Sequence, residues 1–182
     1  MLKQQPLLQD IFVAIQIVTA IIALFYFQKN KKSYWIWFIF YLFFIIFTDH
    51  FIIQIEDFIH IKKQNLYAYI VIPIQFLFFY WLYALKSLKS KEIFTIFVAI
   101  YFASFIPVEL YFEKLKVVFS FNYIIGTLLL MVLVFLEFNK QIKNDDILEF
   151  SKNKMFYINI GVMLFYVGTL PFFGFYHSHP KV

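Results

Sequence analysis

Long apolar runs separated by short polar stretches dominate the chain. Six of these runs are long enough to cross a bilayer, and they cover residues 8–27, 34–55, 66–85, 93–112, 117–137 and 156–176. A spanning helix needs about 20 predominantly apolar residues. The connections are short, so successive helices are expected to be antiparallel neighbours. The pattern predicts an all-α, polytopic transmembrane helix bundle of six spans in a single domain, 1–182.

The two ends of the chain bear on the number of spans. The first run has the length of a signal-peptide core, but it lacks a small-residue cleavage site and "QKNKK" follows it directly. A basic flank of this kind is typical of a retained, stop-transfer helix. The chain ends in "HSHPKV", where a further span would begin. A truncated seven-span design is therefore the alternative to six spans.

The composition favours lipid as the surrounding solvent. Hydrophobic residues make up 63% of the chain, including 28 phenylalanines, whereas soluble domains have about 45–50% apolar residues. There is no cysteine, which excludes disulfides and thiolate chemistry. The net charge of +5 comes from lysines in short clusters between the apolar runs, which is a membrane pattern rather than a nucleic-acid patch. We therefore expect the lipid bilayer as a partner, and no nucleic acid.

The lysine distribution predicts an orientation. Ten of the 16 lysines lie in the first, third and fifth connections, which the positive-inside rule places in the cytoplasm. Both termini are then outside the cell (inner) membrane. The longest connection, 139–154, is the only cytoplasmic stretch large enough to dock a protein partner, although a plain solvated loop is the simpler interpretation. The oligomeric state is not predicted.

Embedded polar side chains gather on the predicted outer side. Asp49 and His50 lie about six residues inside the outer end of the second span, roughly 9 Å at 1.5 Å per residue. An outward-facing polar pocket is predicted from Asp49, His50, Gln75, Glu109 and Asn122. Ionisable groups within a bilayer are costly and often functional, although a buried polar pair can also simply hold helices together. Toward the inner side the polar groups thin out, leaving mainly Asn159 and Glu137.

A metal site is an alternative use of the same side of the membrane. The residues that could contribute are Asp49, His50, His60, Glu109, His177 and His179. Catalytic zinc needs three protein ligands, and these residues supply three only if the fold brings them together. No His-x-x-x-His spacing, P-loop or nucleophile elbow is present, so the sequence offers no motif for a cofactor. For His177 and His179 a solvated tail is the simpler interpretation.

Prolines and glycines punctuate the predicted helices. "VIPIQF" and "FIPVEL" each place a proline two residues before a polar group, Gln75 or Glu109. Such a proline frees a carbonyl one turn back. The last span contains Gly161, Gly168 and Gly174 together with Pro171. Small residues let helices approach closely, so close packing and a kink are expected in this span.

Two stretches carry a resemblance to a known family, "NLYAYIVIPIQFLFFYWLYALKS" (65–87) and "SKNKMFYINIGVMLFYVGTLPF" (151–172). They resemble small uncharacterised multipass proteins of Bacteroidota-type bacteria. Those proteins often carry an acidic residue late in the second helix, then Asn and aromatics that open the third, then a further acidic residue. Asp49, Asn65 and Tyr67 are similar to that pattern, but Gln75 departs from it by removing a charge. The resemblance implies an integral membrane protein without an assigned activity.

Three functional hypotheses follow. The leading one is a non-enzymatic sensory or ligand-binding membrane module with a polar pocket that faces outward. The second is an intramembrane metal-dependent hydrolase that uses the histidines and carboxylates of the outer side. The third is a small transporter, which ranks last because its polar groups should continue through to the cytoplasmic face.

Overall fold

The structure is a computed structural model that describes residues 6–25, 27, 33–59, 66–106, 115–144 and 150–175. The side chains described are those of residues 14–25, 27, 33–48, 66–106, 121–144 and 151–168. All secondary structure in this part of the chain is helical, with no strand, so the predicted all-α class is confirmed. The chain divides into two units, Met1–Leu66 and Tyr67–Val182. Each unit is described by itself.

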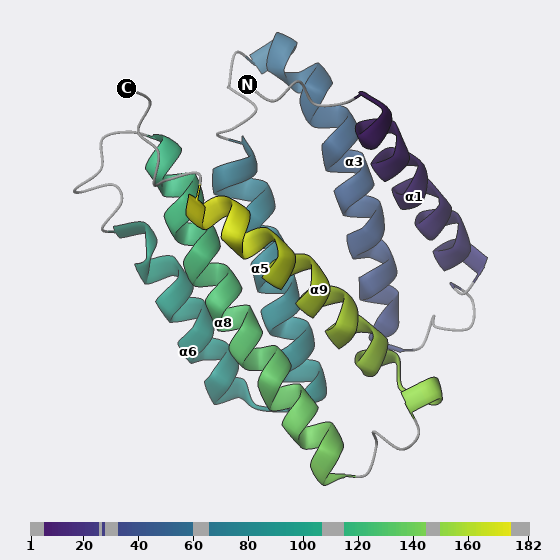
Figure 1. The fold of residues 1–182 in the computed structure, drawn as a ribbon, viewed down its shortest axis with the longest axis vertical. Helices are drawn as coiled ribbons and strands as arrows, with labels where there is room; N and C mark the ends of the chain where they lie inside the picture. The colour runs from purple at the N-terminus through teal and green to yellow at the C-terminus, as the bar shows by residue number, and fades with distance from the viewer. Residues whose placement is uncertain are drawn as a thin grey trace. The chain divides into compact units, whose positions relative to one another are not determined.

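The first unit is a helical hairpin of α1 (Pro6–Phe25) and α3 (Trp35–Ile59), which pack against each other (Figure 1). Its contacts are apolar and aromatic, as in the edge-to-face pair of Phe27 and Phe40 with ring centroids 6.2 Å apart. The hydroxyls of Thr19 and Thr48 donate to carbonyls of their own helices, Ile15 O at 2.8 Å and Ile45 O at 2.9 Å. This local bonding lets threonine sit on an apolar helix without an open hydroxyl.

The second unit contains the remaining helices. η1 (Tyr67–Val71), α5 (Ile72–Tyr80) and η2 (Trp81–Ser87) follow one another as one helical segment, then come α6 (Lys91–Ala103), α8 (Leu115–Lys143), the short η3 (Phe150–Lys152) and α9 (Lys154–Phe175). α5 and α8 pack against each other, and α9 returns obliquely across α8 (Figure 1). The last turns of η2 and α8 and the first turn of α6 share the end of the unit that carries five lysines, Lys86, Lys89, Lys91, Lys140 and Lys143. We call it the lysine end.

Wide π-helical turns flank α5 on both sides. Pro73 has no N–H to donate to the preceding turn, and the π-helical turn of η1 lies directly before it. In η2 the amide of Leu88 donates to Tyr83 O, five residues back, at 2.8 Å. Lys89 then takes a positive φ of 57°, which ends the helix as an αL cap does. The Ser90 hydroxyl oxygen then accepts a hydrogen bond from the Ile93 amide at 3.2 Å, so Ser90 is the N-cap of α6.

The core of the second unit is aromatic and centres on Phe76, which is fully buried. Its ring lies 5.4–6.1 Å, centroid to centroid, from four tyrosines of α5, α6, α8 and α9, namely Tyr80, Tyr101, Tyr123 and Tyr166. Gly126 makes room for it, because a Cβ at that position would lie 2.5 Å from Phe76 Cε2. The predicted close approach at Gly161 and Gly168 is wrong, since a Cβ there would meet nothing within 4 Å. The side chain of Pro171 and position 174 lie outside the described side chains.

The predicted spans coincide with helices, but six membrane crossings are not confirmed. Within the described residues, two helices are long and apolar enough to cross a membrane, Tyr67–Ser87 and Phe121–Lys143. Ala14–Phe25, Trp35–Thr48 and Lys154–Gly168 are shorter apolar helices. The predicted loop 139–154 starts too early, because α8 continues to Lys143. Lys140 and Gln141 extend the helix by bonding to groups at the lysine end.

Candidate functional site

The two faces of α8 have inverted polarity. The face buried in the unit carries Asn122, Thr127, Glu137 and Gln141, each at most 3% exposed. The exposed face carries Leu128, Val132, Phe135 and Leu136, which are 37–62% exposed. α9 repeats the pattern with a fully buried Asn159 and an exposed Leu164 and Phe165. These polar side chains of α8 and α9 therefore lie inside the unit together with apolar ones such as Leu130 and Leu133, while large apolar side chains cover the exposed faces of both helices.

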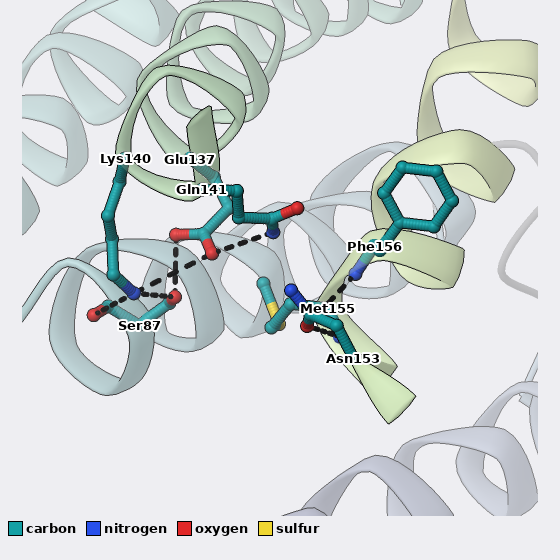
Figure 2. A network of polar contacts seen from close by, with 7 residues as sticks. All are labelled: Ser87, Glu137, Lys140, Gln141, Asn153, Met155 and Phe156. Atoms are coloured by element: carbon teal, nitrogen blue, oxygen red, sulfur yellow. Dashed lines mark hydrogen bonds and ion pairs between the residues drawn. The ribbon is translucent and has the colours of Figure 1, made fainter. Parts of the chain in front are cut away.

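Four side chains form a polar network at the lysine end (Figure 2). The Glu137 carboxylate accepts from Ser87 Oγ at 2.5 Å and from Gln141 Nε2 at 3.0 Å. The Lys140 ammonium lies 3.7 Å from Glu137 Oε1 and donates to the carbonyl oxygen and Oγ of Ser87 at 3.0 and 2.9 Å. We call these four residues the Glu137 network. It joins η2 to α8 across 50 residues of sequence.

Charge and burial in the Glu137 network are balanced. The Glu137 side chain is 2% exposed, whereas that of Lys140 is 35% exposed and reaches the surface of the unit. A buried carboxylate is tolerated when an opposite charge and hydrogen bonds satisfy it, and here the ammonium and two donors do so. Lys140 also caps Ser87 O, a carbonyl at the negative end of a helix. Beside the network, Asn153 Oδ1 accepts the amide of Met155 at 3.0 Å and thereby caps α9 (Figure 2).

Only two of the five residues of the predicted outer pocket have described side chains. Gln75 Nε2 donates to the Tyr166 hydroxyl at 2.6 Å, which ties α5 to α9. Asn122 Oδ1 accepts from Ser104 Oγ at 3.2 Å, which ties α8 to the end of α6. Asp49 and His50 lie on α3, but their side chains are outside the described part, as is Glu109. The pocket therefore stays a prediction.

Among the residues of the second unit whose side chains the structure describes, seven buried side-chain atoms have no hydrogen-bond partner. They belong to six residues of η2, α6, α8 and α9 and are Tyr83 Oη, Tyr101 Oη, Asn122 Nδ2, Thr127 Oγ1, Gln141 Oε1, Asn159 Oδ1 and Asn159 Nδ2. Most buried polar atoms in proteins are paired, so each exception calls for an explanation. All seven atoms belong to neutral hydroxyls or amides. The described interior of this unit therefore offers hydrogen bonds from neutral groups, and its buried carboxylate, Glu137, is paired with Lys140.

The predicted metal ligands do not form a described cluster. Among the residues whose side chains the structure describes, no group of three or more His, Cys, Asp or Glu could hold a metal ion. His60, His177 and His179 lie outside the described residues, so the metal-site hypothesis keeps the status of a prediction. The carboxylate of Glu137 is bound to Ser87, Lys140 and Gln141 instead.

Sequence reasoning missed most of the Glu137 network. Glu137 was placed at an inner boundary, and Ser87, Lys140 and Gln141 were not singled out. The spacing Glu137, Lys140, Gln141 puts all three on one helix face at i, i+3 and i+4, which is the signal that the sequence does contain. Ser87 has no comparable signal, because it reaches Glu137 only through the packing of η2 on α8.

Comparison with known proteins adds no relative. No protein-family model, no curated protein and no solved structure matches the chain. Its function therefore has to be argued from the arrangement of the second unit itself.

Proposed function

We propose that the chain is a multipass integral membrane protein of six spans, set in the cell (inner) membrane with its N-terminus outside, and that it works as a non-enzymatic ligand-binding module. The observation that carries the proposal is the polarity of α8, which buries Asn122, Thr127, Glu137 and Gln141 while Leu128, Val132, Phe135 and Leu136 are exposed. The resemblance to small multipass bacterial proteins supports the same proposal.

The energetics of burial support a lipid environment for the exposed face. Burying a Leu, Val or Phe side chain away from water stabilises the folded protein by about 1.5–3 kcal/mol. Monomeric soluble proteins therefore seldom expose broad apolar faces to water. α8 instead buries Asn122, Thr127 and Gln141, beside apolar residues such as Leu130 and Leu133. In a bilayer this choice is the favourable one, because hydrocarbon satisfies Leu128 and Phe135 while only protein can satisfy the polar groups.

The interior chemistry supports binding rather than catalysis. The buried charge of Glu137 is neutralised by Lys140, and the buried unpartnered groups among the described side chains are hydroxyls and amides. Such groups orient a ligand by hydrogen bonds, but they lack the activated nucleophile or free base that a hydrolase needs. The predicted outer residues Asp49, His50 and Glu109 would extend this interior toward the outside.

Topology mapping with single cysteines tests the membrane proposal. Because the chain contains no cysteine, each introduced thiol is the only site for a membrane-impermeant maleimide. We expect Lys89→Cys and Asn144→Cys to react in inverted membrane vesicles and to stay unlabelled in intact spheroplasts. Phe135→Cys, on the exposed face of α8, should react in neither preparation until detergent is added. Labelling of Phe135→Cys from the aqueous side without detergent would contradict a membrane-embedded α8.

A small transporter is the second candidate, and one observation favours it. The polar groups do not thin out toward the lysine end, because Glu137 is joined there by Ser87, Lys140 and Gln141. Asn122 and Gln141 are 19 positions apart on the buried face of α8, about 28 Å at 1.5 Å per residue. That length is close to the roughly 30 Å of a bilayer core. Faster reswelling of proteoliposomes in glycerol than of empty liposomes would support transport. Equal rates would contradict the transporter and favour the ligand-binding module.

A further inference from the structure

By their positions along η2 and α9, Tyr83 and Asn159 lie between two hydrogen-bonded layers of the second unit. Each layer has one unpartnered atom of its own, Tyr101 Oη beside Tyr80 and Gln141 Oε1 beside Glu137. One layer contains the bonds Tyr80 Oη to Gly126 O at 2.9 Å and Gln75 Nε2 to Tyr166 Oη at 2.6 Å. The other layer is the Glu137 network. Tyr83 lies three residues after Tyr80 and four before Ser87, so it falls between the layers. We call the interior between these layers the middle segment.

Asn159 falls in the same middle segment. Its neighbours along α9 are fixed on both sides, since Phe156 contacts Phe138 near the lysine end with ring centroids 6.4 Å apart. On the other side Tyr166 stacks on Tyr123 at 6.1 Å. Asn159 is fully buried between these contacts, and both atoms of its amide lack a partner.

Tyr83 and Asn159 also lie on the sides of their helices that meet at the Phe79–Tyr166 contact. Phe79 of α5 contacts Tyr166 of α9 edge to face, with ring centroids 6.3 Å apart. Tyr83 is four positions beyond Phe79 and therefore on the same side of its helix. Asn159 is seven positions before Tyr166, again on the same side. Because the two helices run in opposite directions, both steps lead from the Phe79–Tyr166 contact toward the lysine end.

We propose that the middle segment is a binding site for ordered water, held by the Tyr83 hydroxyl and both amide atoms of Asn159. A buried water forms about three hydrogen bonds and requires two to four polar partners. These two residues supply one hydroxyl, one amide donor and one amide acceptor. Thr127 Oγ1 of α8, which is also buried and unpartnered, is a further group on the same stretch of the bundle.

The surrounding chemistry selects water over other guests. A cation would need an uncompensated carboxylate, but Glu137 is already paired with Lys140. An apolar guest would leave three polar atoms buried without partners, at about 1–3 kcal/mol for each group. The inference rests on the proposed function, because it gives the polar interior of the membrane module a hydrated centre. For the transporter candidate, the same water site would be a polar position along the path between Asn122 and Gln141.

Hydroxyl-radical labelling by brief X-ray irradiation tests the site, because radicals formed from bound water modify the side chains beside it. The matched control is Tyr80, which is also fully buried but donates its hydroxyl to Gly126 O. We expect Tyr83 in the purified, detergent-solubilised full chain to be modified several-fold faster than Tyr80. Equal rates at Tyr83 and Tyr80 in the wild-type chain would overturn the proposal without any variant.

A variant then identifies the residue that holds the water. Asn159→Leu should lower the labelling rate of Tyr83 to that of Tyr80, while the exposed Tyr69 keeps its rate and so reports an intact fold. An unchanged rate at Tyr83 would contradict the role of Asn159. The outcome is separable from the proposed function, because cysteine mapping that places α8 in the membrane together with an unlabelled Tyr83 would refute the water site alone.

Discussion

The Glu137 network and the middle segment are neighbours in one helical unit, but their polar side-chain atoms differ in whether they have hydrogen-bond partners. In the network, the carboxylate, the ammonium and the serine hydroxyl all bond to one another, and only Gln141 Oε1 is left over. In the middle segment, Tyr83 and Asn159 have no partner for any polar side-chain atom. Polar groups that bond to one another hold helices together, whereas polar groups without a protein partner are available to bind a guest molecule.

The comparison separates residues that stabilise the fold from residues that bind. Removing one member of a saturated buried network leaves its partners unsatisfied, which is expensive. Removing a hydroxyl that has no protein partner costs far less. Free energies of unfolding in detergent micelles should therefore rank variants by the bonds they break rather than by burial, which is nearly the same at Glu137 and Gln141 as at Tyr83 and Asn159.

The largest effect is expected from Glu137→Ala. The substitution leaves Lys140 without its counter-ion and Ser87 and Gln141 without their acceptor, so the free energy of unfolding should fall by about 3 kcal/mol. Glu92→Ala is the matched control, because Glu92 is exposed in the first turn of α6. It should cost less than about 1 kcal/mol, the usual size of a helix-end charge effect. Equal losses in the two variants would show that the network does not hold the unit together.

Gly126→Ala should cause the next largest loss of stability, because Gly126 lies in the layer that contains Phe76 and the Tyr80 bond, next to the middle segment. Its methyl group would lie 2.5 Å from Phe76 Cε2, and overpacking of a filled core costs about 1–3 kcal/mol. Gly161→Ala provides the control, since a methyl group at that position of α9 meets nothing within 4 Å. It should gain about 0.5–1 kcal/mol from helix propensity. Thermal unfolding of both variants checks the opposite signs, and a stabilising Gly126→Ala would refute the packing.

Ser87→Ala should have a smaller but clear effect. It removes the 2.5 Å donor to Glu137 Oε2, and an unsatisfied buried group costs about 1–3 kcal/mol. The Lys140 bond to Ser87 O survives, which places the expected loss at the lower end of that range. The same unfolding assay applies, and a loss below about 0.5 kcal/mol, the level of an ordinary surface substitution, would contradict the role of the hydroxyl.

The smallest effect is expected from Tyr83→Phe, which makes the sharpest contrast with Ser87→Ala. Both substitutions delete one hydroxyl from the same helix, but the Tyr83 hydroxyl has no protein partner. We expect the free energy of unfolding to stay within about 0.5 kcal/mol of wild type. A loss as large as that of Ser87→Ala would mean that Tyr83 is bonded within the protein.

The sequence predicted the helices far better than the contacts inside them. Apolar runs of helical length located α1, α3, the helical segment Tyr67–Ser87 and α9 to within four residues at each end, because length and hydropathy are local properties. α8 continues past the predicted end at residue 137 to Lys143. Lys140 donates to Ser87 of the neighbouring η2 and Gln141 donates to Glu137 within α8, and the first of these bonds depends on packing that the sequence does not reveal.

The candidate site was harder to predict for a physical reason. Gln75 and Asn122 stood out because a polar side chain in an apolar run is visible in one dimension. Ser87 and Tyr83 did not stand out, because whether a hydroxyl is bonded or open depends on the helix that packs against it. Gly126 was overlooked and the last-span glycines were overvalued for the same reason, as only the position of the Phe76 ring distinguishes them.

The central claim, that polar groups are inside and apolar groups face lipid, is tested most directly by spin labels on the exposed face of α8. Single cysteines at Leu128, Val132 and Phe135 would be spin-labelled in lipid vesicles, and collision rates with oxygen and with a water-soluble nickel chelate would be measured. The account predicts high oxygen and low nickel accessibility at all three positions, with Asn144→Cys showing the reverse. High nickel accessibility at Leu128, Val132 and Phe135 would place that face in water and contradict the account.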